Sequence, residues 1–147
     1  AATLPVTMER VEEHLGVEKE VSGFVLPVGA TVNMDGTSLY QGIAAVFIMQ
    51  VIWPEGLTFT NQLVIIATAL LASIGSAAVP SAGMVMLVIV LGAIGVPTEG
   101  LALIFGVDRI LDMMRTVVNV TGDATVATVV ASTEGQLREV TEEELMS

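Results

Sequence analysis

The sequence predicts an all-α, integral membrane fold: a broken transmembrane helix, then a re-entrant helical hairpin, then a long transmembrane helix. Three observations lead to this prediction. First, the 147 residues are 53% hydrophobic with a mean hydropathy of +0.80, and 14% are charged, where about a quarter is usual for a soluble domain. Second, most charges gather near the two ends of the chain. Third, short polar or small-residue segments interrupt the apolar stretches between them.

The first apolar stretch, 21–53, is expected to be a transmembrane helix with a break inside it. A polar, helix-compatible segment, 9–20, precedes it, and residues 33–37, of sequence NMDGT, interrupt it. Gly36 permits backbone angles that other residues avoid, so we expect the helix to unwind there. Unwound backbone at membrane depth survives only where it is buried in protein or lines a cavity.

The second apolar stretch, 57–96, is expected to fold back on itself as a re-entrant hairpin. A bilayer span needs about 20 apolar residues, and each half of this stretch is close to or below that length. Its middle, 73–83, is rich in small residues. A tip of this kind would let the backbone approach a ligand and would present free N–H and C=O groups. Close packing between membrane helices is the alternative explanation.

The third apolar stretch, 101–132, is expected to be one long helix with a single polar stripe. On a helix of 3.6 residues per turn, its polar residues fall within an arc of roughly 100° around Asp112. These residues are Asp108, Arg115, Thr116, Asn119 and Asp123. Ionisable residues inside a membrane usually face the protein interior or water and mark a functional site. The alternative is an ion-pair ladder that holds helices together.

The stripe carries groups that suit a zwitterionic acidic ligand. The planar guanidinium of Arg115 can bind a carboxylate through two hydrogen bonds, and Asp112, one turn away, can pair with an ammonium group. The pattern therefore predicts a pocket for an amino acid with an acidic side chain. Asn119 and Asp123 offer hard oxygen ligands one turn apart, which suit a small alkali cation.

The break at 33–37 is a second candidate cation site. Unwinding frees main-chain carbonyls, which bind cations at the end of a half-helix, and Asn33 and Asp35 add a carboxamide and a carboxylate. The alternative is a kink at Gly36 in which Asn33 and Asp35 cap the following half-helix.

The composition argues against several other classes of protein. Cysteine is absent and His14 is the single histidine, so no thiol or multi-histidine metal centre is expected. The net charge of −11 and the acidic ends argue against nucleic acid as a partner. No nucleophile–base pair is visible, so we expect neither an enzyme nor a cofactor. A polar-lined membrane channel domain and, less well supported, a soluble helical enzyme are the remaining alternatives.

The basic residues predict an orientation. Arg10, Lys19 and Arg138 flank the outermost segments, whereas the two inner turns, 53–56 and 96–100, carry no Lys or Arg. The positive-inside rule then places both ends in the cytoplasm, including an acidic tail at 135–147. Because the chain starts abruptly and without Met, we expect it to be a fragment of a longer protein.

The chain contains NMDGT at 33–37, the small-residue tip at 73–83 and DMMRTVVNVTGD at 112–123. In this order and spacing, the three segments resemble the dicarboxylate/amino acid:cation symporters, the glutamate transporter family. The resemblance covers residues 1–134 and implies the C-terminal part of a transport domain. The implied parts are the end of the first hairpin (1–8), a polar connector (9–20), a broken seventh helix (21–53), the second re-entrant hairpin (57–96) and the eighth helix (101–132).

The resemblance also implies a substrate site and sodium sites. The substrate site would consist of Thr37, Val79, Gly83, Asp112, Arg115, Thr116 and Asn119. One sodium site would consist of Gly29, Asn33, Asn119 and Asp123. A second, formed largely by backbone carbonyls, would consist of Thr31, Met34, Ser73, Ile74 and Ser76. Asn33 and Asp35 would contribute to a third.

The function implied for the full-length protein is uptake of glutamate or aspartate, coupled to sodium or, as in some relatives, to protons. Such proteins are homotrimers in the cell membrane, inner or plasma, whose transport domains move like elevators. Within the family, the position of Arg115 separates acidic from neutral substrates, and Asp112 favours an amino acid. Symport of a C4-dicarboxylate or a neutral amino acid is the alternative. Ala78 and Ser81 depart from the glycines of some relatives.

Overall fold

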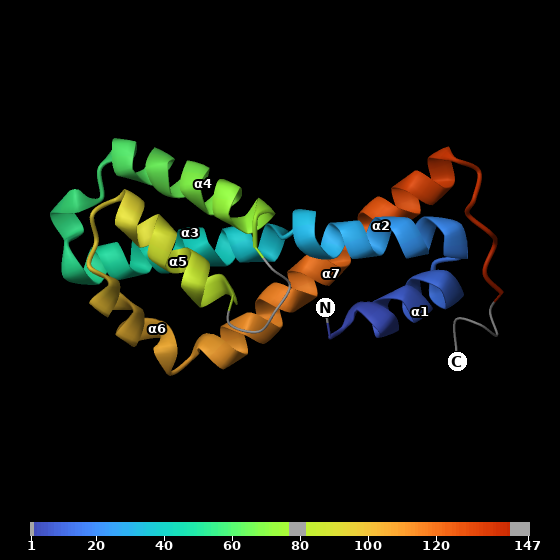
Figure 1. Ribbon diagram of the computed structural model, residues 1–147, viewed down its shortest axis with the longest axis horizontal. Helices are drawn as coiled ribbons and strands as arrows, with labels where there is room; N and C mark the ends of the chain where they lie inside the picture. Colours follow the sequence, from blue (N-terminus) through green and yellow to red (C-terminus); the bar gives the residue numbers. More distant parts are fainter. Residues whose placement is uncertain (1, 77–81, 142–147) are drawn as a thin grey trace.

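The computed structural model describes residues 2–76 and 82–141, and in this part of the chain every named element is a helix (Figure 1). The α-helices are α1 (Leu4–His14), α2 (Lys19–Val32), α3 (Asp35–Ile52), α4 (Phe59–Ile74), α5 (Ala82–Ala93), α6 (Ala102–Phe105) and α7 (Asp108–Thr133). Two 3₁₀ turns, η1 (Pro54–Gly56) and η2 (Thr98–Leu101), connect them. The all-helical part of the predicted fold is confirmed.

The break in the first apolar stretch is real but shorter than predicted. Helices α2 and α3 follow one another along the long axis of the molecule, and only Asn33 and Met34 lie between them (Figure 1). Their ψ angles of 74° and 59° depart from helical geometry. The prediction that the chain unwinds at Gly36 is wrong, because Gly36 lies in the first turn of α3. A Cβ atom there would collide with the carbonyl oxygen of Arg115, so this glycine permits close packing on α7.

The predicted hairpin is present as α4 and α5, which lie side by side and pack against α3 (Figure 1). Helix α4 starts with a side-chain cap, in which the Thr58 hydroxyl accepts a hydrogen bond from the N–H of Asn61 at 3.3 Å. Residues 77–81 of the predicted tip, among them Ala78, Val79 and Ser81, lie outside the described residues.

The third apolar stretch is not the single helix that was predicted. The chain forms η2 and the short α6, turns at Gly106 and Val107, and only then begins α7. Glycine disfavours the helical conformation by about 1 kcal/mol relative to alanine, which favours a turn at Gly106. Tight packing fixes the position of the preceding 3₁₀ turn, η2. A Cβ atom on Gly100 would collide with the side chain of Ile48 on α3. Over residues 2–76 and 82–141, we find no helix that is both long and apolar enough to cross a bilayer.

Two hydrophobic clusters form the interior. One joins α3, α4 and α5 with the turns around α6, through Tyr40, Ala44, Ala45, Ile48, Met49, Ile65, Ala69, Ala72, Leu87, Val90, Leu91, Ile94, Val96 and Ile104. The other joins α1, α2 and α7 through Val11, Val17, Val21, Leu26, Ala127 and Ala131. Helix α7 packs against both α2 and α3 (Figure 1). The α2–α3 break therefore lies where the two clusters meet.

The start of the predicted acidic tail is packed against the loop between α1 and α2. Val17 and Leu137 form an isolated antiparallel bridge, and the N–H of Arg138 donates to the carbonyl of Gly16 at 2.8 Å. Gly16 has a φ of 72°, and a Cβ atom there would collide with the carbonyl of Arg138. We call these contacts of residues 16–18 with 136–138 the terminal clasp.

The terminal clasp predicts that Gly16→Ala destabilises the protein more than Gly95→Ala. Both glycines have positive φ, at 72° and 70°, but a Cβ atom on Gly95 would meet nothing within 4 Å. Backbone strain should cost about 1–2 kcal/mol in each variant. The collision in Gly16→Ala should add about 1–3 kcal/mol. Thermal unfolding of the purified variants measures the difference, and equal losses would contradict the clasp.

Candidate functional site

A cavity of about 490 Å³ lies where α7 passes the α2–α3 break and the start of α5. All six predicted substrate-site residues in the described part of the chain line it, namely Thr37, Gly83, Asp112, Arg115, Thr116 and Asn119. The seventh, Val79, lies outside the described residues. Residues that the sequence had not assigned to the site also line it, namely Ala2, Thr3, Ala30, Ala82, Arg109, Met113, Val117 and Val120.

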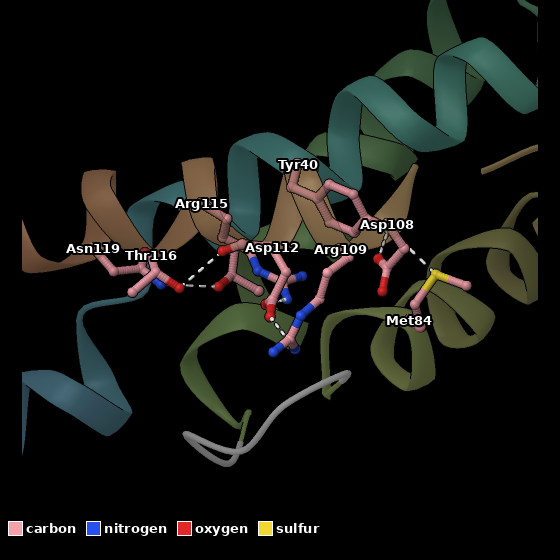
Figure 2. A network of polar contacts seen from close by, with 9 residues as sticks. Tyr40, Met84, Asp108, Arg109, Asp112, Arg115, Thr116 and Asn119 are labelled. Carbon is pink, nitrogen blue, oxygen red and sulfur yellow. Dashed lines mark hydrogen bonds and ion pairs between the residues drawn. The ribbon is translucent and has the colours of Figure 1, made fainter. Parts of the chain in front are cut away.

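Arg115 is the main charged group in the wall of this cavity, and its side chain is only 6% exposed. Its Nη2 pairs with Oδ1 of Asp112, one turn earlier on α7 (Figure 2). Its Nη1 is buried and has no hydrogen-bond partner among residues 2–76 and 82–141. A Cβ atom on Gly83 of α5 would collide with this nitrogen. Because a buried guanidinium N–H without a partner is costly, the site favours an anionic ligand at Nη1.

The Tyr40 ring contacts the guanidinium of Arg115, and the Tyr40 hydroxyl is bonded to Asp108. The Cζ atom of Arg115 lies 4.8 Å from the centre of the Tyr40 ring, a cation–π distance. The Tyr40 hydroxyl donates to Oδ1 of Asp108 at 3.0 Å and lies 3.3 Å from the sulfur of Met84 (Figure 2). Sequence reasoning placed Asp108 on the stripe but missed Tyr40. The available signal was the position of Tyr40 three residues after Thr37, on the same face of α3.

Asp112 stands between two arginines. Besides Arg115, its Oδ2 lies 3.9 Å from Nη1 of Arg109, whose side chain is 77% exposed. Exposed ion pairs of this kind contribute little, so the Asp112 carboxylate keeps one oxygen for another partner. The Thr116 hydroxyl donates to the Asp112 backbone carbonyl at 2.8 Å, which ties both residues to the same turn of α7 (Figure 2).

Asn119 joins the stripe to the start of α3. Its Oδ1 accepts a hydrogen bond from the N–H of Gly36 at 2.8 Å, and its Nδ2 donates to the Thr37 hydroxyl at 3.2 Å. The first N–H groups of a helix lack partners within the helix, and Asn119 supplies one from α7. The alternative in which Asn33 and Asp35 cap this helix is not observed, because Met34 is the N-cap residue and makes no side-chain cap bond.

Two members of the first predicted sodium set, Gly29 and Asn33, lie against the carboxylate of Asp123, whereas the carboxamide of Asn119 bonds the start of α3. The Asn33 Nδ2 donates to Asp123 Oδ1 at 3.0 Å, and the Asn33 N–H donates to the Gly29 carbonyl at 2.8 Å. A Cβ atom on Gly29 would lie 2.5 Å from the same Asp123 oxygen. Asp123 is 6% exposed and forms no ion pair with the residues that the structure describes. A small cation would balance this buried carboxylate.

The second predicted sodium set was expected to bind largely through backbone carbonyls, and two of its five residues line the cavity. Met34 and Ser76 line the cavity, and the buried Ser76 hydroxyl has no hydrogen-bond partner within the described residues. The other hydroxyls bond within their own helices, Thr31 to the Val28 carbonyl at 3.0 Å and Ser73 to the Leu70 carbonyl at 2.8 Å. Ile74 is 55% exposed.

The third predicted sodium set, Asn33 and Asp35, faces Gly122 of α7 across the break. A Cβ atom on this glycine would lie 2.9 Å from Asp35 Oδ2 and 3.0 Å from Asn33 Nδ2. No group of three or more His, Cys, Asp or Glu side chains suited to a metal ion occurs in the part of the chain that the structure describes. Any cation here would therefore depend on amide, hydroxyl and backbone oxygens as well as carboxylates.

Comparison with known proteins assigns the chain to a family. Residues 1–133 match the sodium:dicarboxylate symporter family. The chain is 53% identical over 127 residues to Excitatory amino acid transporter 2 of Homo sapiens, a match covering 84% of this chain and 21% of the relative. It is 49% identical over 145 residues to Excitatory amino acid transporter 4 of Mus musculus, covering 99% of this chain and 26% of the relative.

The chain therefore spans only about a quarter of the length of these curated relatives. The resemblance inferred from the three motifs is confirmed by matches that run through all of them. The chain belongs to the sodium:dicarboxylate symporter family, a family of membrane transporters and not of enzymes.

Proposed function

We propose that the full-length protein containing this chain is a secondary active symporter that takes up glutamate or aspartate together with sodium. The observation that carries this proposal is the buried guanidinium of Arg115, a residue that lines a cavity beside Asp112 and whose Nη1 has no hydrogen-bond partner among the described residues. The names of the relatives, excitatory amino acid transporters, support the same substrate class.

The geometry supports a defined orientation of the substrate. Its side-chain carboxylate would bind Nη1 of Arg115, and its ammonium group would bind the Asp112 oxygen that faces the exposed Arg109. Substrate binding would give the buried Nη1 of Arg115 a carboxylate partner. It would also give the Asp112 carboxylate a stronger partner than the exposed Arg109. The volume of about 490 Å³ lies within the range of roughly 300–1,000 Å³ that small-ligand sites occupy.

Asn119 is the residue through which cation and substrate would be coupled. It lines the cavity, and its carboxamide bonds the start of α3 directly after the break that carries Asn33. A cation bound between Asn33 and Asp123 would fix the end of α2, and hence the position of Asn119 and Thr37 in the substrate site. Each ligand would then favour the geometry that the other needs, which is the requirement for coupling.

The proposal extends to the whole protein. We place it in the cell membrane as a multi-pass protein with a cytoplasmic C-terminus, assembled as a homotrimer and working by an elevator motion. The outer surface of α4 is consistent with a lipid or protein neighbour, because its large apolar side chains are exposed, namely Phe59, Leu63, Ile66, Leu70 and Leu71.

The test is uptake by the full-length protein in liposomes under an inward sodium gradient, an inward proton gradient or neither. We expect aspartate and glutamate to accumulate under the sodium gradient alone. Accumulation under the proton gradient alone would show that protons, not sodium, are the coupling ion. Accumulation of succinate or alanine instead of aspartate and glutamate would show that the proposed substrate is wrong. Ion flux without any accumulated substrate would favour a channel and refute the proposal.

Arg115→Cys should abolish selectivity for acidic substrates. Loss of a buried charge partner typically costs about 2–5 kcal/mol, so aspartate binding should weaken by that amount while alanine binding changes little. Isothermal titration of the full-length protein in sodium measures both affinities. Arg10→Cys, at an exposed arginine of α1 that does not line the cavity, is the control and should keep aspartate affinity within about threefold. Equal losses for both substrates would contradict the role of Arg115.

Tyr40 should support Arg115 in two separable ways. Tyr40→Phe removes the hydrogen bond to Asp108 but keeps the ring, and should weaken aspartate binding by about 1 kcal/mol. Tyr40→Leu also removes the cation–π contact and should cost about 0.5–2 kcal/mol more. Phe47→Leu, an exposed aromatic on the same helix, serves as control. The same affinity in the Phe and Leu variants would show that the ring does not position the guanidinium.

A further inference from the structure

We infer that Gly122 is a positioning residue for cation binding, although it offers no ligand of its own. The absence of a side chain at this point of α7 leaves the space that the ends of Asp35 and Asn33 occupy. This inference rests on the proposed function, because it assumes that these two residues and Asp123 bind the coupling cation.

The atoms nearest to Gly122 indicate that it positions side chains and does not set the distance between helices. The three atoms nearest to a Cβ at this position are Asp35 Oδ2 at 2.9 Å, Asn33 Nδ2 at 3.0 Å and Asn33 Cγ at 3.9 Å. All three belong to side chains, and none belongs to backbone. Gly36 shows the opposite case, because a Cβ there would collide with a backbone carbonyl of α7. Gly36 thus sets the distance between helices, whereas Gly122 leaves room for polar side chains.

An alanine at position 122 would therefore disturb the site and leave the fold intact. The Asp35 carboxylate would have to shift, and Asn33 Nδ2 would have to give by a few tenths of an ångström. Asn33 Nδ2 also donates to Asp123 Oδ1 at 3.0 Å, so this contact would be disturbed as well. Binding constellations tolerate displacements of only about 0.5 Å. The helix itself would benefit, because alanine favours the helical conformation over glycine.

Gly29, on the opposite helix α2, likewise leaves room for a polar side chain of its neighbour. A Cβ atom on Gly29 of α2 would lie 2.5 Å from Asp123 Oδ1 and 2.9 Å from its Cγ, so this glycine leaves room for the carboxylate from α7. Gly122 leaves room for the amide and carboxylate that follow α2. Each side of the α2–α7 contact thus carries one glycine that faces a polar group of the other side.

The experiment uses the purified full-length protein with the substitution Gly122→Ala. The matched control is Gly23→Ala on α2, where a Cβ atom would meet nothing within 4 Å. We expect both variants to unfold in sodium-free buffer at or above the wild-type temperature. The sodium concentration that gives half-maximal aspartate binding should rise about 10- to 100-fold in Gly122→Ala, the usual cost of losing a supporting group around a metal site, and should stay unchanged in Gly23→Ala.

A double-mutant cycle with Asn33→Ser tests the path of the effect. If Gly122 acts by making room for the Asn33 amide, Gly122→Ala should cause little further loss of sodium affinity in the Asn33→Ser background. Additive losses both in this background and in an Asp35→Ser background would overturn the inference. So would a wild-type sodium response in Gly122→Ala, or failure of that variant to fold, because the methyl group would then meet more than two side-chain ends. If the wild-type protein itself shows no sodium response, the proposed function fails instead.

Discussion

The architecture depends on one constraint, which is that the polar groups of a mostly apolar chain must satisfy one another. The break between α2 and α3 leaves N–H groups at the start of α3 without partners inside that helix. Asn119, on α7, accepts a hydrogen bond from one of them at Gly36, and Asn33, at the end of α2, donates to Asp123 further along α7. The break and the polar stripe are therefore two halves of one structure, and neither would be stable in apolar surroundings alone.

This mutual dependence also decides where the cavity lies. The two hydrophobic clusters sit on either side of the break, and α7 contributes to the contacts of both. At their junction the chain uses glycines in place of side chains. Gly36 brings α3 close to α7, while Gly83 leaves room for the guanidinium of Arg115. Small residues at the junction thus let α3 and the start of α5 pack closely around Arg115 of α7, beside the cavity.

The site gains its chemical character from incomplete pairing. Arg115 is held by Asp112 and the Tyr40 ring, yet one of its nitrogens keeps no partner among the described residues. Asp123 is buried beside a neutral amide, with no cationic side chain paired to it in that same part of the chain. A buried guanidinium N–H without a partner and a buried carboxylate without a counter-charge both raise the free energy of the empty state. An acidic substrate and a small cation would each relieve one of these costs.

Helical periodicity in the sequence predicted the polar stripe on α7, and the resemblance to the family supplied the other expected site residues. The stripe on 108–123 could be derived because side chains three and four residues apart share a face, and six of the seven predicted substrate residues do line one cavity. The three motifs were specific enough to identify the family. The existence of the break at Asn33 and of the α4–α5 hairpin also followed from local composition.

Only the tertiary structure decided the features that arise between segments distant in the chain. The break is confined to Asn33 and Met34 because Asn119, more than 80 residues away, caps the next helix. The third stretch turns before α7 where Gly100 packs on Ile48, the start of the tail is packed by the terminal clasp, and Tyr40 meets Arg115 across two helices. Local periodicity cannot specify such contacts, since each is a property of two surfaces brought together by folding.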